Sequence, residues 1–218
     1  MILFDCDGVL VDSEVIACGV FADKVAARVP TLDRRDFASG IFGFSDEQIL
    51  ARVEADQGVR FPAGFLDDVK AAIEAALVSD LQPIAGVAAA LDAIAQPKAV
   101  VSNSPRARVE RSLDRAGVRH HFGDAVYCGD MVERQKPFPD LYLMAAGRHG
   151  RDPAHCLVVE DSVTGVSAGV AAGMTVLGFL GGSHIVDGHG ARLLAAGASA
   201  VVDRMERLPD LIATRSSI

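Results

Sequence analysis

The sequence lacks the features that would place the protein in a membrane or in an oxidising compartment. None of its apolar runs approaches the roughly 20 residues of a membrane-spanning helix, and its first residues reach a charge too soon for a signal peptide. The four cysteines are scattered, without a C-x-x-C pair or zinc-binding spacing. We expect them to be small buried residues in a reducing compartment, which predicts a cytoplasmic protein. The six histidines also stand at no ligand spacing, so we expect His120, His121 and His184 at the surface or at helix ends.

Positive charge is scarce as well. The chain has 21 Lys and Arg against 29 Asp and Glu, a formal net charge of -8, which argues against a nucleic-acid partner because phosphate binding needs a basic patch. No repeat of fixed period and no low-complexity tract is present. Half of the 218 residues are apolar, enough for one large domain or for a core domain with a smaller insertion. Nothing in the sequence indicates an obligate interface, so we expect a monomer.

The first residues hold the most informative pattern. An apolar run, Ile2–Phe4, leads into Asp5 and Asp7, and Gly8 follows. If the run is a strand, both carboxylates point to the same face at its carboxyl end, where open parallel α/β sheets bind ligands. Two like charges this close repel each other unless one is protonated or a cation lies between them. A metal site and a solvated turn both fit this pattern, since Asp and Gly are turn formers.

The next segment, 13–81, has the periodicity of helices and no strand pattern. Helical spacing and the positions of proline and glycine predict three helices there, at about 13–29, 46–57 and 63–79. Asp12-Ser13 can cap the first, and Ser45–Gln48 has the pattern of a capping box for the second. From residue 82 onward, short Val-rich runs alternate with helical stretches, which indicates a parallel sheet covered on both faces. We expect the later strands at 99–101, 125–128, 157–159, 176–179 and 200–202, with helices at 104–117 and 162–173.

This layout predicts an α/β fold, a Rossmann-like parallel-sheet core with a small all-helical domain inserted after the first strand. The core comprises residues 1–12 and 82–218, and the insertion comprises 13–81. Polar residues follow three of the predicted strands at ends that should converge. They are Asp5 and Asp7 after the first, Ser102-Asn103-Ser104 after the second, and Glu160-Asp161 after the 157–159 strand. Each could be a helix cap or a solvated end, but together they indicate a site.

Four segments of the chain resemble the four motifs of the haloacid dehalogenase superfamily, in the same order. They are Phe4–Glu14, Val101–Ser104, Lys136-Pro137, and Val159–Ser162 with Gly165. The resemblance covers essentially the whole chain. The insertion is similar to the small four-helix cap of β-phosphoglucomutase-like members. The segment from Pro83 to Phe122 and the tail to Ile212 are similar to bacterial sugar-phosphate phosphatases, including 6-phosphogluconate phosphatases.

The resemblance implies a role for each matched residue. Asp5 would be the nucleophile that forms an aspartyl-phosphate, and Asp7 would protonate the leaving oxygen and later accept a proton from water. Ser102 would bind phosphoryl oxygens. Lys136 would bridge the nucleophile and the phosphate, supplying positive charge to the transition state. Asn103 would contact the phosphate or the substrate, although helix capping explains it nearly as well.

The family also implies a metal. Mg²⁺ suits an all-oxygen site, and its ligands would be the side chains of Asp5 and Asp161 with the main-chain carbonyl of Asp7. Glu160 would either be a further ligand or contact the ligands without binding the ion itself. Gly8 would leave room for the tight turn and for substrate to approach the backbone.

These residues favour one branch of the superfamily. The second carboxylate and the acidic pair argue against metal-independent dehalogenases, and a cap with only Lys24 and Lys70 argues against Schiff-base hydrolases. Phosphosugar mutases carry an arginine where this chain has Asp46, which would repel a phosphate. We therefore expect a Mg²⁺-dependent phosphatase acting on a small phosphate ester such as a sugar phosphate, with a phosphosugar mutase as the alternative. A non-catalytic binding module on the same fold would have lost some of these residues.

Overall fold

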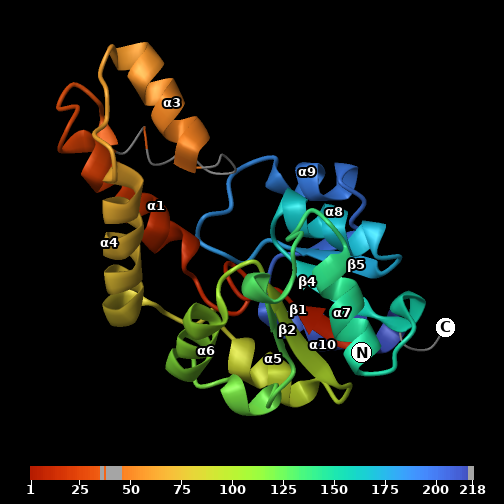
Figure 1. The fold of residues 1–218 in the computed structure, drawn as a ribbon. Coiled ribbons are helices and arrows are strands. Elements are labelled where there is room, and N and C mark those ends of the chain that lie inside the picture. The colour runs from red at the N-terminus through yellow and green to blue at the C-terminus, as the bar shows by residue number, and fades with distance from the viewer. Residues whose placement is uncertain (35–36, 38–45, 216–218) are drawn as a thin grey trace. The chain divides into compact units, whose positions relative to one another are not determined.

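The computed structural model describes residues 1–34, 37 and 46–215, which fall into two compact units (Figure 1). Unit 1 comprises Met1–Asp12 and Gln82–Ile218, and unit 2 comprises Ser13–Leu81. No helix among the described residues is long and apolar enough to cross a membrane.

The core of unit 1 is a parallel sheet. Among the described residues it has six strands in the order β3-β2-β1-β4-β5-β6. Their bounds are β1 Ile2–Phe4, β2 Lys98–Ser102, β3 Val126–Cys128, β4 Leu157–Glu160, β5 Thr175–Phe179 and β6 Ala200–Val202. The structure thus confirms the predicted Rossmann-like α/β core. Strand order reverses between β1 and β4, and this switch point is where open α/β sheets bind ligands.

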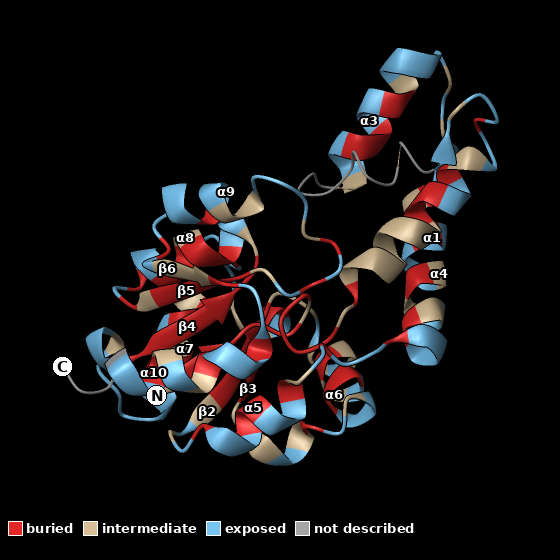
Figure 2. Ribbon diagram, turned by 180° about the vertical axis from the view of Figure 1, so that it is seen from behind, coloured by how far each residue is buried: buried red, intermediate tan, exposed pale blue. Residues whose placement is uncertain are grey.

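Helices cover both faces of this sheet (Figures 1 and 2). Those in unit 1 are α5 Val87–Ala93, α6 Arg106–Arg115, α7 Asp140–Arg148, α8 Val163–Ala171, α9 His189–Ala195 and α10 Leu208–Arg215. Helix α8 contacts both α7 and α9, and α5 contacts α10. The predicted helices at 104–117 and 162–173 correspond to α6 and α8, each shorter by a few residues. At α8 the cap is as expected, because the Ser162 hydroxyl accepts a hydrogen bond from the Gly165 N–H.

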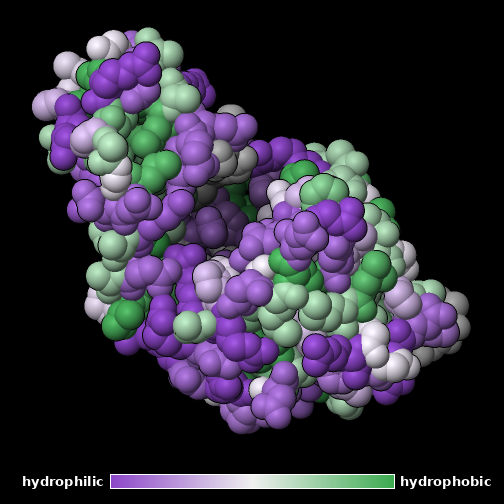
Figure 3. All heavy atoms as spheres, in the orientation of Figure 1, coloured by the Kyte–Doolittle hydropathy of each residue, from purple (hydrophilic) through white to green (hydrophobic). Residues whose placement is uncertain are grey.

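Burial follows from this layering. The strands near the middle of the sheet are buried along their length, whereas the helices are buried on their inner faces and exposed on their outer ones (Figure 2). Tyr142 and Leu141 of α7 pack in one apolar cluster with Val158 of β4 and Val166 of α8. Full burial of a side chain such as Leu contributes about 1.5–3 kcal/mol, so this cluster stabilises the packing of α7 and α8 against the sheet. On the surface of unit 1 visible in Figure 3, hydrophilic and hydrophobic residues are interspersed.

Unit 2 is helical in its described part. Its helices are α1 Glu14–Ala26, α3 Asp46–Gln57 and α4 Phe65–Asp80. Helices α1 and α4 pack together, and α4 buries Phe65, Val69, Ile73 and Leu77 along one stripe of i, i+4 spacing. The predicted bounds of α3 are confirmed, although its expected capping residue Ser45 lies outside the described residues. Ser13 stands at the N-cap of α1 but makes no capping hydrogen bond with its side chain, so that part of the prediction was wrong.

The chain passes from unit 1 to unit 2 and back at adjacent points of unit 1. The Asp12 N–H donates to the Gln82 carbonyl over 2.9 Å, and the Ile84 N–H donates to the Leu10 carbonyl over 3.0 Å. These bonds keep the segment after β1 and the segment before α5 side by side. An insertion of 69 residues therefore leaves the sheet continuous.

Candidate active site

Acidic side chains gather at the carboxyl ends of β1 and β4. The two strands are neighbours, with Phe4 opposite Val159, and the Asp5 N–H extends the pairing by donating to the Val159 carbonyl over 3.0 Å. Asp5, Glu160 and Asp161 are 7%, 1% and 4% exposed. Their carboxylate oxygens lie within 4.8 Å of one another. Three buried carboxylates at the switch point of the sheet need compensating positive charge.

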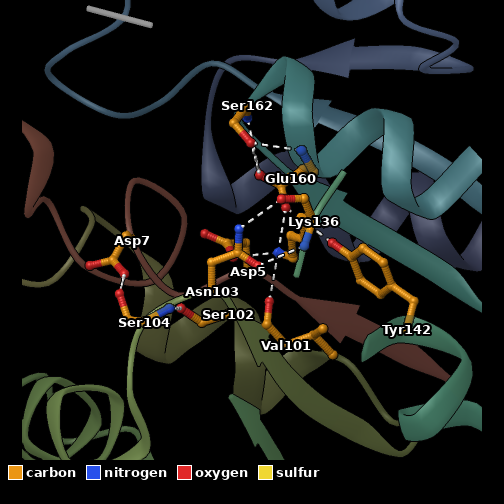
Figure 4. A network of polar contacts seen from close by, with 11 residues as sticks. Asp5, Asp7, Val101, Ser102, Asn103, Ser104, Lys136, Tyr142, Glu160 and Ser162 are labelled. Atoms are coloured by element: carbon orange, nitrogen blue, oxygen red, sulfur yellow. Dashed lines mark hydrogen bonds and ion pairs between the residues drawn. The ribbon is translucent and has the colours of Figure 1, made fainter. Parts of the chain in front are cut away.

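Lys136 supplies part of that charge (Figure 4). Its Nζ donates to Asp5 Oδ1 at 2.6 Å, to Glu160 Oε2 at 2.8 Å and to the Val101 carbonyl at 2.7 Å. The ammonium has three donors, and these three bonds use them all. Burial disfavours the charged form, but Asp5 and Glu160 outweigh it and raise the pKa of Lys136 well above its usual value. The lysine is therefore a permanent cation between two carboxylates.

Glu160 is held on both of its oxygens. Its Oε2 accepts from Lys136 and also from the Tyr142 hydroxyl at 3.0 Å, and its Oε1 accepts from the Ser162 hydroxyl at 2.8 Å. Burial raises the pKa of Glu160, but Lys136 and Ser162 overcome that effect and the net pKa is lowered. A Cβ on Gly165 would stand 2.0 Å from this carboxylate, so the glycine makes room for it. Glu160 is therefore an ionised group with hydrogen bonds to both of its oxygens.

Asp5 differs from Glu160 in its electrostatics. Burial and then the charge of Glu160 raise the pKa of Asp5 well above its usual value, with Lys136 offsetting part of the effect. One lysine is not enough to balance Asp5, Glu160 and Asp161 together. The donor set is entirely carboxylate oxygen, which is the chemistry that Mg²⁺ prefers, and a divalent cation would remove the imbalance. The residues present fit such an ion.

Asp7 lies in the turn after β1, and its side chain has a different partner from Asp5. Asp7 Oδ2 accepts from the Ser104 hydroxyl at 2.8 Å (Figure 4). The Ser104 N–H in turn donates to Ser102 Oγ over 3.0 Å, and Ser102 is 1% exposed. The segment after β2 therefore orients the second carboxylate. The sequence places Ser104 in the Ser-Asn-Ser motif and at the start of a helix, but its contact with Asp7 was not predicted.

Asn103 contacts the backbone that carries Lys136. The Lys136 N–H donates to Asn103 Oδ1 over 3.0 Å, and Asn103 Nδ2 donates to the Lys136 carbonyl over 3.1 Å. This pair of bonds joins the end of β2 to the loop before α7. The Lys136-Pro137 peptide bond in that loop is cis. A phosphate or substrate contact by Asn103 stays a prediction.

Gly8 and His184 surround Asp161. Gly8 has φ +76°, and a Cβ there would lie 1.9 Å from Asp161 Oδ2, so no other residue fits this turn without displacing the carboxylate. His184 Nε2 lies 2.9 Å from the same Oδ2. His184 is 8% exposed, so the expectation of a surface or helix-end residue was wrong. The pairing depends on the loop after β5 folding back over the end of β4, which local sequence does not reveal.

The comparisons with known proteins agree on a family. Residues 1–173 match the model of the haloacid dehalogenase-like hydrolases. The chain is 34% identical over 184 residues to the 6-phosphogluconate phosphatase of Escherichia coli K12, covering 84% of this chain and 83% of that protein.

Solved structures extend the likeness to three dimensions. A conserved haloacid dehalogenase-like protein of unknown function from Agrobacterium tumefaciens superposes with a TM-score of 0.91 at 36% identity, covering 99% of this chain and 98% of that one. A haloacid dehalogenase family hydrolase from Deinococcus radiodurans, with bound phosphate and sodium, superposes with a TM-score of 0.85 at 36% identity, covering 98% and 94%. The chain belongs to the haloacid dehalogenase-like hydrolase family.

Proposed function

We propose that the protein is a Mg²⁺-dependent phosphatase that hydrolyses a small phosphorylated metabolite, such as a sugar phosphate, through an aspartyl-phosphate. The observation that carries this proposal is the buried ammonium of Lys136, bonded to Asp5 and Glu160 next to Asp161. The relative named 6-phosphogluconate phosphatase and the bound phosphate in the Deinococcus structure support it. In this proposal unit 1 is the catalytic core and unit 2, residues 13–81, is the cap that selects the substrate.

Asp5 would act as the nucleophile. One of its oxygens would attack phosphorus as the bond from phosphorus to the leaving oxygen breaks, forming an acyl phosphate on Asp5. Asp7 would donate its proton to the leaving oxygen and then accept a proton from the water that attacks phosphorus. That second attack breaks the bond between the Asp5 oxygen and phosphorus, releases phosphate and regenerates the carboxylate. The hydrogen bond from Ser104 to Asp7 would keep the acid/base group oriented through both steps.

Lys136 and Ser102 would bind the transferring phosphoryl group. The Lys136 ammonium already contacts Asp5, so a phosphoryl group joined to Asp5 would meet its charge as negative charge develops. Ser102, at the end of the adjacent strand, would donate its hydroxyl to a phosphoryl oxygen. Asn103 would contact the phosphate or substrate as well as hold the Lys136 backbone, and Gly8 would allow the close approach of that group to the chain.

The side chains of Asp5 and Asp161, with the main-chain carbonyl of Asp7, would hold Mg²⁺, and Glu160 would be a ligand or a support for the ligands. When bound, the ion would supply the positive charge that the carboxylates lack and would keep the phosphoryl group in line for attack. Its removal should therefore abolish turnover.

The defining experiment measures phosphate release from a panel that includes 6-phosphogluconate, fructose 1-phosphate, hexitol phosphates and p-nitrophenyl phosphate, with Mg²⁺ and with EDTA. We expect release that requires Mg²⁺ and that falls by about 10³-fold or more in Asp5→Asn, while Asp124→Asn, at an exposed acidic position, keeps full activity. A protein that releases no phosphate but interconverts a sugar phosphate in the presence of a bisphosphate primer would be a mutase, and the proposal would then fail.

We also propose a cytoplasmic location and a monomer. All four cysteines are free and three are buried, as suits a reducing compartment. Light scattering on the purified protein tests the oligomeric state directly.

A further inference from the structure

A second group of metal-ligating side chains lies elsewhere in unit 1. Asp92, near the end of α5, meets His120 and His121 of the short 3-10 helix η1 (Arg119–His121). Ligand atoms of the three residues lie within 4.8 Å of one another, and the two imidazole rings are 4.0 Å apart between centroids. The spacing of the histidines alone does not indicate this group, because Asp92 is far from them in the sequence.

His121 carries an unsatisfied polar atom in this group. Its side chain is 9% exposed and its Nε2 is 3.6 Å from Asp92 Oδ1, too long for a hydrogen bond. No hydrogen-bond partner for that Nε2 occurs among the residues that the structure describes. A buried ring nitrogen without a partner costs free energy, so a group that accepts its lone pair would stabilise this part of the structure.

The chemistry of the donors points to the ion class. Two imidazole nitrogens and one carboxylate oxygen suit Zn²⁺ and related transition ions, whereas Mg²⁺ prefers oxygen alone. Lys98, at the start of β2, is the competing cation, since it interacts with both Asp92 and His121.

We propose that Asp92, His120 and His121 bind one transition-metal ion of the Zn²⁺ class, with water completing the coordination. The site is distinct from the carboxylate cluster. Helix α5 leads into β2 and η1 precedes β3, so the three ligands lie toward the amino ends of the strands, whereas Asp5 and Glu160 follow the carboxyl ends. A bound ion would tie α5 to η1, two segments separated by a strand and a helix.

The test is calorimetric titration of the protein with Zn²⁺ in excess Mg²⁺, which keeps the carboxylate cluster occupied. We expect one Zn²⁺ per chain and at least about tenfold weaker binding in His120→Asn and in Asp92→Asn. Loss of a residue that merely hydrogen-bonds to a metal ligand already lowers metal affinity about tenfold or more. His155→Asn, at an exposed histidine outside the group, should bind as the wild type does.

Two further readouts accompany the titration. Zn²⁺ should raise the melting temperature of the wild type and of His155→Asn but not of His120→Asn. Because His120 is exposed and remote from the cluster, His120→Asn should keep full Mg²⁺-dependent activity. Unchanged Zn²⁺ affinity in both ligand variants, or no Zn²⁺ binding by the wild type, would overturn the proposal.

The loop after β5 carries an independent inference. Ser183 donates its N–H to Asp12 Oδ1 over 3.1 Å and its hydroxyl to the other oxygen of that carboxylate, while His184 Nε2 lies 2.9 Å from Asp161 Oδ2. At Gly182 a Cβ would come within 2.7 Å of the His184 ring, so the glycine admits the ring. His189, at the start of α9, contacts the Asp161 carbonyl.

We infer that His184 is a positioning residue that fixes the Asp161 carboxylate for metal binding, an inference that rests on the proposed function. We expect His184→Ala to weaken Mg²⁺ binding by about 10–100-fold, as loss of a group that hydrogen-bonds to a metal ligand does. The variant should therefore need a higher Mg²⁺ concentration for activity. His184→Gln retains a side-chain donor and should recover part of the affinity.

Calorimetry with Mg²⁺ on the wild type, His184→Ala and His184→Gln gives the answer without any substrate. Equal Mg²⁺ affinity in the three proteins would refute the positioning role. If the wild type binds Mg²⁺ but releases phosphate from no ester, the proposed function fails while the role of His184 in metal binding can still be judged.

Discussion

At the scale of single residues, the site is defined by one buried cation among buried anions. Lys136 is the one lysine or arginine that is buried among the described residues, and its three bonds leave the ammonium no freedom. Removing one partner of a buried ionic group leaves the others uncompensated, which costs more than the pair itself contributes.

We predict that Lys136→Met lowers kcat by about 10²–10³-fold, because the transition state loses a preorganised charge. The variant should also melt at a lower temperature than the wild type when Mg²⁺ is absent, since Asp5 and Glu160 lose their partner. Lys70→Met, at an exposed position of α4, is the matched control. Wild-type kcat in Lys136→Met would contradict the assignment of this lysine to the phosphoryl group.

A second residue-scale prediction concerns Gly165, whose added Cβ would collide with the Glu160 carboxylate at 2.0 Å. Gly165→Ala should destabilise the protein by about 1–3 kcal/mol, as overpacking does, and should reduce activity by displacing Glu160. Gly147→Ala in α7 meets nothing within 4 Å and should instead stabilise by about 0.5–1 kcal/mol. Urea unfolding of both variants checks the two signs, and equal effects would show that Glu160 is free to move aside.

At the scale of elements, the site depends on how the ends of β1, β2 and β4 are tied to the loop before α7. Asn103 makes that tie through its two hydrogen bonds to the Lys136 backbone. These bonds hold the backbone from which the Lys136 side chain reaches Asp5.

We predict that Asn103→Ala destabilises the protein by about 1–3 kcal/mol, because two polar partners lose their bonds, and lowers kcat by loosening Lys136. Asn103→Asp keeps the acceptor for the Lys136 N–H but loses the donor to its carbonyl, so an intermediate result is expected. Thermal melts and steady-state kinetics report the two effects. A change in KM alone, with stability intact, would instead indicate that Asn103 serves the substrate.

The sequence was sufficient to predict the strands, because Val-rich runs and their flanking turns are local signals. The four motifs likewise predicted a site at Asp5, Ser102, Lys136 and the acidic pair, and the structure brings Asp5, Lys136, Glu160 and Asp161 together. Several contacts were not predicted, among them the bond from Ser104 to Asp7. Tyr142 lies on the buried, mostly apolar face of α7, so its sequence context does not indicate the hydrogen bond to Glu160. His184 contacts Asp161 from the loop after β5. The grouping of Asp92 with the two adjacent histidines brings together residues that are far apart in the sequence, which no local pattern encodes.

At the scale of the whole molecule, the charge of the site is part of a net charge of -8. Repulsion between like charges destabilises the compact state of an acidic protein. Here part of that repulsion lies between the buried carboxylates of Asp5, Glu160 and Asp161. The fold therefore tolerates an arrangement that is unfavourable without a cation, because the strands and helices of unit 1 hold the three carboxylates in place. Metal binding and stability are consequently linked.

This linkage predicts opposite effects of one substitution with and without the metal. Saturating Mg²⁺ should raise the melting temperature of the wild type by about 5–10 °C, the shift expected for a ligand at about 100 times its Kd, and EDTA should remove the gain. Asp161→Asn removes one buried charge and can still accept the bond from His184. In EDTA this variant should melt above the wild type, and with Mg²⁺ it should melt below it, because it no longer binds the ion well. Calorimetric melts of both proteins in both conditions decide the matter: if Asp161→Asn is the less stable protein in EDTA, the carboxylate cluster is held together by its hydrogen bonds alone, and charge repulsion is not what the metal relieves.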